Sequence, residues 1–166
     1  MKQAMIRYMK TEKNDEIYTP KEAIIPILKY LDKTKIYWEC TDFEDSNIKK
    51  VLVENGFKVI ATNKEEFDFL KDDPSFKFDV IITNPPYSIK NKFIKRCYEL
   101  NKPFLLLLPI TALEGKERNR LYKENGLEII VLNKRINFMK EKKNVWFNTS
   151  WFCHKICNEQ LNFEEV

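Results

Sequence analysis

Two short, mostly apolar runs constrain the fold of this chain more than any other feature of its sequence. They occupy residues 78–83 (FDVIIT) and 103–108 (PFLLLL). Each run has the length of a β-strand, and successive side chains of a strand point to opposite faces of the sheet. Both faces of these strands must therefore be covered by other elements, which is typical of a mostly parallel sheet flanked by helices.

Short apolar runs alternate with segments of helical period from residue 35 onward. The predicted strands span residues 35–40, 57–62, 78–83, 103–108, 127–132 and 147–156. The predicted helices span residues 46–55, 90–100 and 115–125, the first and last ending at Gly56 and Gly126. This alternation predicts an α/β fold. Ligands of such sheets bind beyond the carboxyl ends of the strands, where the strand order reverses.

A further helix is predicted before the first strand. Thr19 is expected to be its N-cap, Pro20 its first residue and Glu22 the partner of Thr19 in a capping box. Pro26 lies inside the predicted helix and should bend it. Residues 1–16 are polar and without a clear period, so we expect a loose or partner-ordered arm there, followed by a single domain over residues 17–166.

Composition limits the cellular setting. The 166 residues are 43% hydrophobic, which suffices for one packed core. No apolar run approaches the length of a bilayer span, and the start at Met1 lacks a hydrophobic signal segment, so we expect a cytoplasmic protein without a membrane partner. The net charge of +4 permits a polyanionic partner without requiring one.

The cysteines predict neither disulfides nor a metal site. Cys40, Cys97, Cys153 and Cys157 lie in or beside apolar segments, without the regular spacing of a small secreted protein, so buried thiols are expected. Cys153, His154 and Cys157 could form half of a zinc site. The sequence has no second Cys/His pair to complete four ligands.

The segment after the 78–83 strand carries the chemistry. It reads Asn84-Pro85-Pro86-Tyr87, and its two prolines fix φ and remove two backbone donors, which leaves a rigid loop that presents acceptors. An amino group on an aromatic ring is a poor nucleophile because its lone pair is delocalised. The Asn84 side-chain oxygen and the Pro85 carbonyl could accept its two N–H bonds and favour a pyramidal nitrogen, with Tyr87 stacking on the ring. A structural turn is the alternative interpretation.

With this tetrapeptide the chain resembles the amino-methyltransferases, specifically the small adenine-N6 DNA methyltransferases of phages and prophages. The resemblance covers most of residues 18–153 and implies a Rossmann-like class I methyltransferase fold with S-adenosylmethionine as cofactor. It also implies that Asn84, Pro85, Pro86 and Tyr87 are the catalytic residues, acting on adenine in nucleic acid, DNA more readily than RNA. The setting would be the cytoplasm of a bacterial or phage-infected cell, where such enzymes serve restriction-modification.

The resemblance extends to the cofactor-binding segments. Tyr18-Thr19-Pro20 resembles the family's leading cofactor segment, Trp38-Glu39 the acidic start of its cofactor loop, and Asp68-Phe69 the segment that brackets the cofactor's adenine. Trp38 and Phe69 could equally be core residues, and Asp68 could be an acid at a helix end.

Two positions depart from the family's pattern. The cofactor loop is usually rich in glycine, whereas here Asp42 and Ser46 stand in it. Asp42 or Glu39 could meet the cofactor's ammonium, and Ser46 could cap the following helix while standing where a small residue is needed. Asn63 stands where the family usually carries an acid that binds both ribose hydroxyls.

A late basic segment resembles the part of the family in which an aromatic ring stacks on the flipped target base. It runs from Asn133 to Phe138, and basic residues cluster around it: Lys134, Arg135, Lys140, Lys142 and Lys143, with Trp146 close by. Charge for a phosphate backbone and a ring for a displaced base fit nucleic acid. The predicted substrate-binding residues are Ser88, Lys90, Arg135 and Phe138. A solvated charged loop, which Glu141 favours, is the alternative.

Three questions stay open at the level of sequence. No stretch is long enough for a separate target-recognition domain, so specificity is low, the substrate is single-stranded, or a partner or second subunit supplies recognition. The same tetrapeptide serves methyltransferases that modify a glutamine amide in a protein. A loop without glycine also fits a catalytically impaired methyltransferase fold that works as a binding or regulatory protein.

Overall fold

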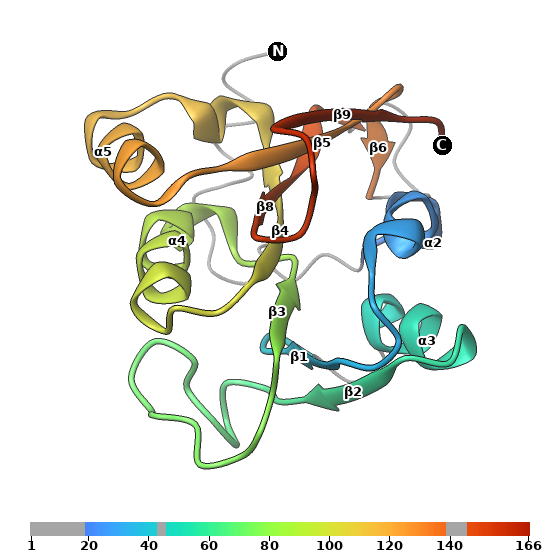
Figure 1. The fold of residues 1–166 in the computed structure, drawn as a ribbon, viewed down its shortest axis with the longest axis vertical. Helices are drawn as coiled ribbons and strands as arrows, with labels where there is room; N and C mark the ends of the chain where they lie inside the picture. The colour runs from blue at the N-terminus through green and yellow to red at the C-terminus, as the bar shows by residue number, and fades with distance from the viewer. Residues whose placement is uncertain (1–18, 43–45, 139–145) are drawn as a thin grey trace.

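A computed structural model describes residues 19–42, 46–138 and 146–166, without the side chains of 146 and 147. A central sheet separates two pairs of helices, as Figure 1 shows: α2 and α3 lie on one side and α4 and α5 on the other. Helices thus flank both faces of the sheet, as the two apolar runs predict.

The seven strands of the sheet follow the order β2-β1-β3-β4-β8-β5-β9. Their bounds are Ile36–Glu39 (β1), Lys58–Ala61 (β2), Val80–Thr83 (β3), Phe104–Pro109 (β4), Glu128–Leu132 (β5), Thr149–His154 (β8) and Leu161–Glu164 (β9). The pairs β1–β2, β1–β3, β3–β4 and β5–β9 are parallel, whereas β8 runs antiparallel to both β4 and β5. The predicted mostly parallel sheet is confirmed, and each predicted strand is present. β4 is shifted by one residue from its predicted bounds, and the others are slightly shorter than predicted.

Three strands were not predicted. In β9, Leu161 and Phe163 have 54% and 72% of their surface exposed. The strand therefore lacks the buried apolar face by which strands are predicted from sequence. β6 (Ile136–Asn137) and β7 (Trp146–Phe147) form a separate two-stranded sheet. Two residues per strand are too few to give a periodic signal.

The three predicted helices between the strands are confirmed. Their bounds are Asn47–Glu54 (α3), Lys90–Glu99 (α4) and Lys116–Asn125 (α5). The Ser46 hydroxyl caps α3 by accepting a hydrogen bond from the Ile48 N–H at 3.2 Å. Gly126 ends α5 with φ 86°, a left-handed conformation that only glycine adopts without strain.

The predicted start of the first helix is wrong. Pro20, not Thr19, occupies the N-cap of α2 (Lys21–Ile24), and no side-chain cap forms there. The Thr19 carbonyl instead accepts a hydrogen bond from Asn47 Nδ2 at 2.8 Å, which ties this segment to α3. Pro26 does not merely bend the helix. The chain continues as the 3₁₀ helix η2 (Ile25–Tyr30), because proline removes an N–H and crowds the preceding turn.

Alternate residues of the same strands build two hydrophobic layers. Ile82, Leu107 and Trp151 face α2 and α3, whereas Ile81 and Leu106 face α4. Every one of these side chains is fully buried. The two layers hold the carboxyl ends of β1, β3 and β4 at one fixed edge.

Trp151 connects β8 to α2, and its replacement by phenylalanine should destabilise the fold. Its indole N–H donates to the Ala23 carbonyl at 2.7 Å, across 128 residues of sequence. Trp151→Phe should lower the free energy of unfolding in urea by about 2 kcal/mol, because buried surface and a buried hydrogen bond are lost together.

Tyr98→Phe is the matched control. It removes a hydroxyl that donates to the Gly126 carbonyl at 2.7 Å in an exposed position. Its cost should stay below about 1 kcal/mol. Equal losses in the two variants would contradict the importance of the Trp151 bond.

Candidate functional site

The strand order reverses at β1. The chain passes from β1 to β2 on one side and then returns to pair β3 with the other side of β1. The carboxyl ends of β1 and β3 therefore meet, with Glu39 as the last residue of one strand and Thr83 as the last of the other. Open α/β sheets bind ligands at this kind of position.

The Glu39 carboxyl group is the centre of a hydrogen-bond network at this edge. Glu39 is 1% exposed. Its Oε1 accepts from the Thr83 hydroxyl at 2.6 Å and from both the backbone N–H and the hydroxyl of Thr41 at 3.1 Å. Its Oε2 accepts from the Ser46 hydroxyl at 3.4 Å, and the Thr41 and Thr83 hydroxyls also bond to one another. One carboxyl group thus joins β1, the loop after it and the end of β3.

Burial changes the protonation of Glu39. Removal from water disfavours the carboxylate and raises the pKa of Glu39 to about 7, although the hydrogen bonds from Thr83 and Thr41 oppose this shift. Glu39 therefore exchanges a proton near neutral pH, which an ordinary glutamate does not.

Asp42 holds the loop that follows β1. Its Oδ1 accepts from the Ser46 N–H at 3.1 Å, and its Oδ2 pairs with Lys49 Nζ at 3.3 Å. Its own N–H donates to the Thr62 carbonyl, beyond β2, at 3.0 Å. Bonds of Asp42 and Ser46 thus connect the described residues that precede and follow 43–45. Residues 43–45 lie outside the described residues.

The Asn84-Pro85-Pro86-Tyr87 loop begins at the same edge, directly after Thr83. Pro85 is buried, and Pro86 precedes the short 3₁₀ helix η3 (Tyr87–Ile89), which leads into α4. The Asn84 side-chain oxygen and the Tyr87 hydroxyl are both buried, and the Tyr87 ring packs against both hydrophobic layers. The two prolines therefore lie in a turn supported from both sides of the sheet.

The predicted substrate residues next to this loop have different surroundings. Ser88 is exposed. Lys90 is half-buried, and its Nζ donates to the Tyr87 carbonyl at 3.0 Å. Arg135 is exposed, and Phe138, at 9% exposure, belongs to the layer on the α2 side. The predicted basic residues Lys140, Lys142 and Lys143 lie outside the described residues.

Trp38 and Phe69 are packing residues. Trp38 is fully buried, and its indole N–H donates to the Thr62 hydroxyl at 2.9 Å. Its ring contacts four phenylalanine rings at centroid distances of 4.8–5.4 Å: Phe67, Phe69, Phe76 and Phe78. Phe69 also stacks on Phe93 of α4 at 5.0 Å. Of the two interpretations considered for Trp38 and Phe69, these contacts favour the core.

The remaining predicted cofactor residues are engaged locally. The Asn63 oxygen accepts from the N–H groups of Glu65 and Glu66 at 2.9 and 3.0 Å, so its amide nitrogen is the group left for a ligand. Asp68 accepts from the Leu70 N–H at 3.0 Å and pairs with a neighbouring lysine. Thr19 and Pro20 are buried, and Tyr18 lies outside the described residues.

Thr41 and Thr83 are site residues that the sequence analysis missed. Thr83 could have been found, because it is a polar residue that ends an otherwise buried strand. Thr41 could not, because its hydroxyl meets that of Thr83, 42 residues away in the sequence.

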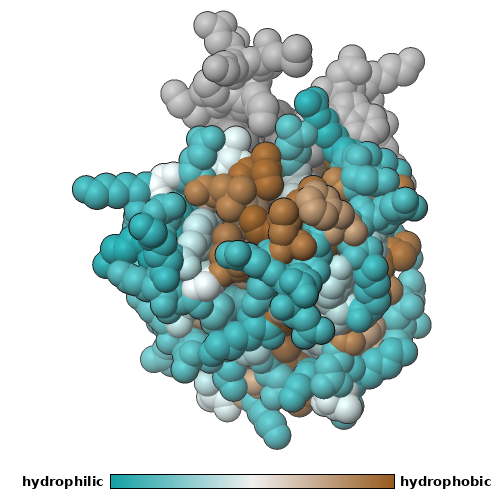
Figure 2. Space-filling view, turned by 45° about the horizontal axis from the view of Figure 1, so that its top comes forward, coloured by the Kyte–Doolittle hydropathy of each residue, from teal (hydrophilic) through white to brown (hydrophobic). Residues whose placement is uncertain are grey.

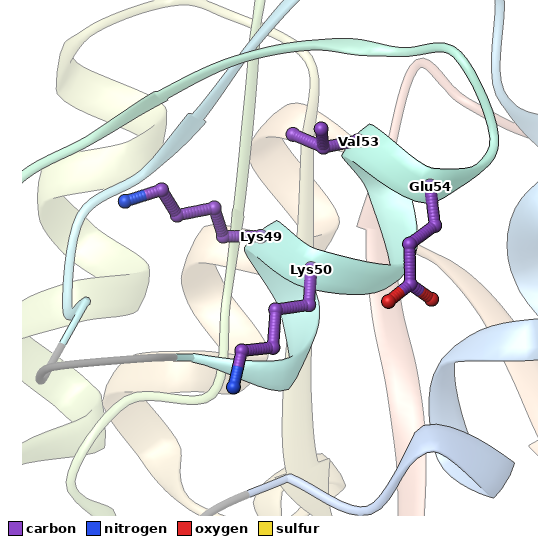
Figure 3. Close-up of a pocket in the computed structure, with 4 residues that line it drawn as sticks. All are labelled: Lys49, Lys50, Val53 and Glu54. Carbon is purple, nitrogen blue, oxygen red and sulfur yellow. The ribbon is translucent and has the colours of Figure 1, made fainter.

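Two features mark the surface of the molecule. Figure 2 shows hydrophobic side chains gathered on the face turned toward the viewer. Figure 3 shows a hollow on α3 lined by Lys49, Lys50, Val53 and Glu54. None of the predicted site residues lines this hollow.

Among the described residues, no group of three or more His, Cys, Asp or Glu side chains is placed to hold a metal ion. In the same part of the chain, no helix combines the length and apolar character that crossing a bilayer requires. The thiols of Cys40, Cys97 and Cys153 are buried, as predicted, whereas Cys157 is only partly so.

Solved structures of known proteins share this fold. A solved structure of the type I restriction-modification system methyltransferase subunit from Streptococcus thermophilus matches 90% of this chain and 47% of that chain, with a TM-score of 0.54 and 17% identity. The chain has a methyltransferase fold. The predicted Rossmann-like class I architecture is thereby confirmed.

A sequence relative points in the same direction. The chain is 28% identical over 85 residues to the type II methyltransferase M.EcoRI of Escherichia coli, a match that covers 51% of this chain and 23% of that protein. The matched part is thus about a quarter of that relative's length. No model of a protein family matches the sequence.

The buried Glu39 makes the stability of this methyltransferase fold depend on pH. Its raised pKa means that the folded state keeps a proton that the unfolded state releases above about pH 4.5, so stability should fall as pH rises toward 7. Glu39→Gln removes this dependence. Its free energy of unfolding relative to wild type should increase by up to about 3 kcal/mol between about pH 5 and pH 8, measured in urea.

Glu65→Gln is the control, because Glu65 is exposed. It lies outside the Glu39 network and so reports the effect of the substitution itself. A difference between Glu39→Gln and wild type that does not change with pH would contradict the raised pKa of Glu39.

Proposed function

We propose that this chain transfers a methyl group from S-adenosylmethionine to the exocyclic amino group of adenine in nucleic acid, preferably DNA. One observation carries the proposal: Asn84-Pro85-Pro86-Tyr87 leaves β3 where the strand order reverses, next to the buried carboxyl group of Glu39. The methyltransferase fold supports it, and so does the likeness to M.EcoRI, a type II methyltransferase.

The loop after β1 is the proposed cofactor site. A donor of this kind carries a positively charged ammonium, which a carboxylate binds well. Asp42 is half-buried at the start of the loop, and the Glu39 carboxyl group lies beside it. Charge on Asp42 would attract the cofactor where the family that the chain resembles brings a glycine backbone close to it. The Asn63 amide nitrogen would donate to a ribose hydroxyl, and Thr19 and Pro20 would line the site from the segment before α2.

The Asn84 loop would activate the amine. The Asn84 oxygen and the Pro85 carbonyl accept its two N–H bonds and localise its lone pair, while Tyr87 lies against the ring. No strong base is needed, since the proton can leave after the methyl group has transferred. Arg135 would meet a phosphate, and Phe138 would stack on the displaced base. Because the Asn84 oxygen is buried, the edge must open to admit the base.

Recognition of a target sequence is proposed to depend on a partner or second subunit. The chain matches 47% of a solved protein that is itself a subunit of a type I restriction-modification system. A domain of this size has little surface left for reading base edges beside the catalytic edge.

Cofactor binding is the first test, by calorimetric titration of the wild-type protein with S-adenosylmethionine. We expect saturable binding that Asp42→Ala weakens by about tenfold, because a charge-assisted bond to the ammonium is lost. Asp73→Ala is the matched control, since the Asp73 side chain is 91% exposed and pairs with Arg96, away from the loop after β1. Lack of binding by folded wild-type protein would favour a catalytically impaired binding module.

Asn84→Ala tests the catalytic role. We expect transfer of tritiated methyl groups to DNA to fall by about a hundredfold or more, because the variant loses an acceptor needed in the transition state. The affinity for S-adenosylmethionine should stay unchanged. Asn125→Ala, at the exposed end of α5, is the control.

Parallel reactions with RNA and with protein separate the substrate classes. Transfer to protein alone would support the glutamine-amide alternative instead.

A further inference from the structure

Thr149 lies at the same edge of the sheet as the Asn84 loop. It is the first residue of β8, and it pairs with Pro109, the last residue of β4. Because β8 is antiparallel to β4, its beginning coincides with the carboxyl end of β4. β4 in turn is the neighbour of β3, which leads into Asn84.

The Thr149 hydroxyl is a buried polar group without a hydrogen-bond partner among the described residues. Thr149 is 4% exposed. Two other threonine hydroxyls at this edge, those of Thr41 and Thr83, both bond to Glu39. Buried hydroxyls are nearly always hydrogen-bonded, so one that is not indicates a position where a ligand completes the bonding.

Thr149 points to the α2 side of the sheet. Side chains alternate along a strand, and Trp151 and Cys153, two and four residues further on, both belong to the layer on that side. Val80 and Ile82 of β3 belong to the same layer, and continuation of that alternation brings Asn84 to this side as well. Phe138 is also in the layer. The proposed amine-binding residue, the proposed stacking ring and Thr149 therefore face one region.

The spacing suits a single aromatic base. Thr83 pairs with Leu106 and Thr149 with Pro109, which puts Asn84 two residues along and two strands across from Thr149. With the usual rise and strand spacing, their Cα atoms lie roughly 12 Å apart. This distance accommodates the side chains of Asn84 and Thr149, a hydrogen bond from each of them, and one edge of a base between them.

We propose that the Thr149 hydroxyl donates a hydrogen bond to a ring nitrogen of the target base, beside the amino group held by Asn84. Adenine offers an acceptor nitrogen on each side of that amino group, and a hydroxyl can donate to either. This role rests on the proposed function. The Asn84 oxygen is as buried as the Thr149 hydroxyl, so the opening that admits the amine to Asn84 also gives the base access to Thr149.

Two variants of matched shape test this role on an adenine-containing single-stranded oligonucleotide with saturating S-adenosylmethionine. Thr149→Val removes the hydroxyl and should lower kcat/KM for the oligonucleotide by about tenfold to a hundredfold, with unchanged affinity for S-adenosylmethionine. Thr149→Ser keeps the hydroxyl and should stay within about threefold of wild type.

Stability separates a substrate contact from a structural role. Because the hydroxyl has no partner among the residues that the structure describes, Thr149→Val should melt at or above the wild-type temperature while losing activity. A melting temperature clearly below that of wild type would mean that the hydroxyl has a structural partner, and would overturn the proposal.

Modified oligonucleotides identify the atom. 1-Deazaadenine and 7-deazaadenine each lack one ring nitrogen, and the wild-type enzyme should lose rate with one of them. Thr149→Val should show no further loss with that base. An equal loss in both proteins, or full activity of Thr149→Val, overturns the role of Thr149. Binding of S-adenosylmethionine by wild type without methylation of any nucleic acid overturns the proposed substrate and this role together.

Discussion

The hydrogen-bonded burial of the Glu39 carboxyl group is the constraint on which the rest of the site depends. A buried carboxyl group must find partners, and here they come from the loop after β1 and from the end of β3. Thr83 is thereby fixed one residue before Asn84. The proposed catalytic loop and the residues of the proposed cofactor site that are described share this one anchor.

The same anchor explains how a loop can dispense with glycine. Glycine allows a backbone to approach a ligand, but it leaves the loop free to change shape. In this chain the Asp42 side chain bonds to Ser46 and to Lys49 and so connects the residues before and after 43–45. A ligand bound here would meet side-chain charge and hydrogen-bonding groups.

Much of the fold could be predicted from the sequence, and less of the site. Apolar runs such as 78–83 indicate strands because the pattern lies within a few consecutive residues. Ser46 indicates a helix start because a side-chain cap also depends only on neighbouring residues. The N-cap prediction for Thr19 is wrong, and the contact that holds this residue instead, from Asn47 to the Thr19 carbonyl, joins segments 28 residues apart in the sequence. Trp38 shows why the site was harder to predict. The sequence of an aromatic residue near the end of a strand is the same whether the ring binds a ligand or fills the core. Only the contacts of the ring in the folded structure distinguish the two.

The position of β8 between β4 and β5 has a consequence for synthesis of the chain. β4 is a six-residue, fully buried strand, and the neighbour that covers one of its edges is made 40 residues later. While the nascent chain leaves the ribosome, that edge is open and can pair with other chains. Completion of this part of the sheet therefore waits until β8 has been made, and the nascent chain is most vulnerable to aggregation in the interval between β4 and β8.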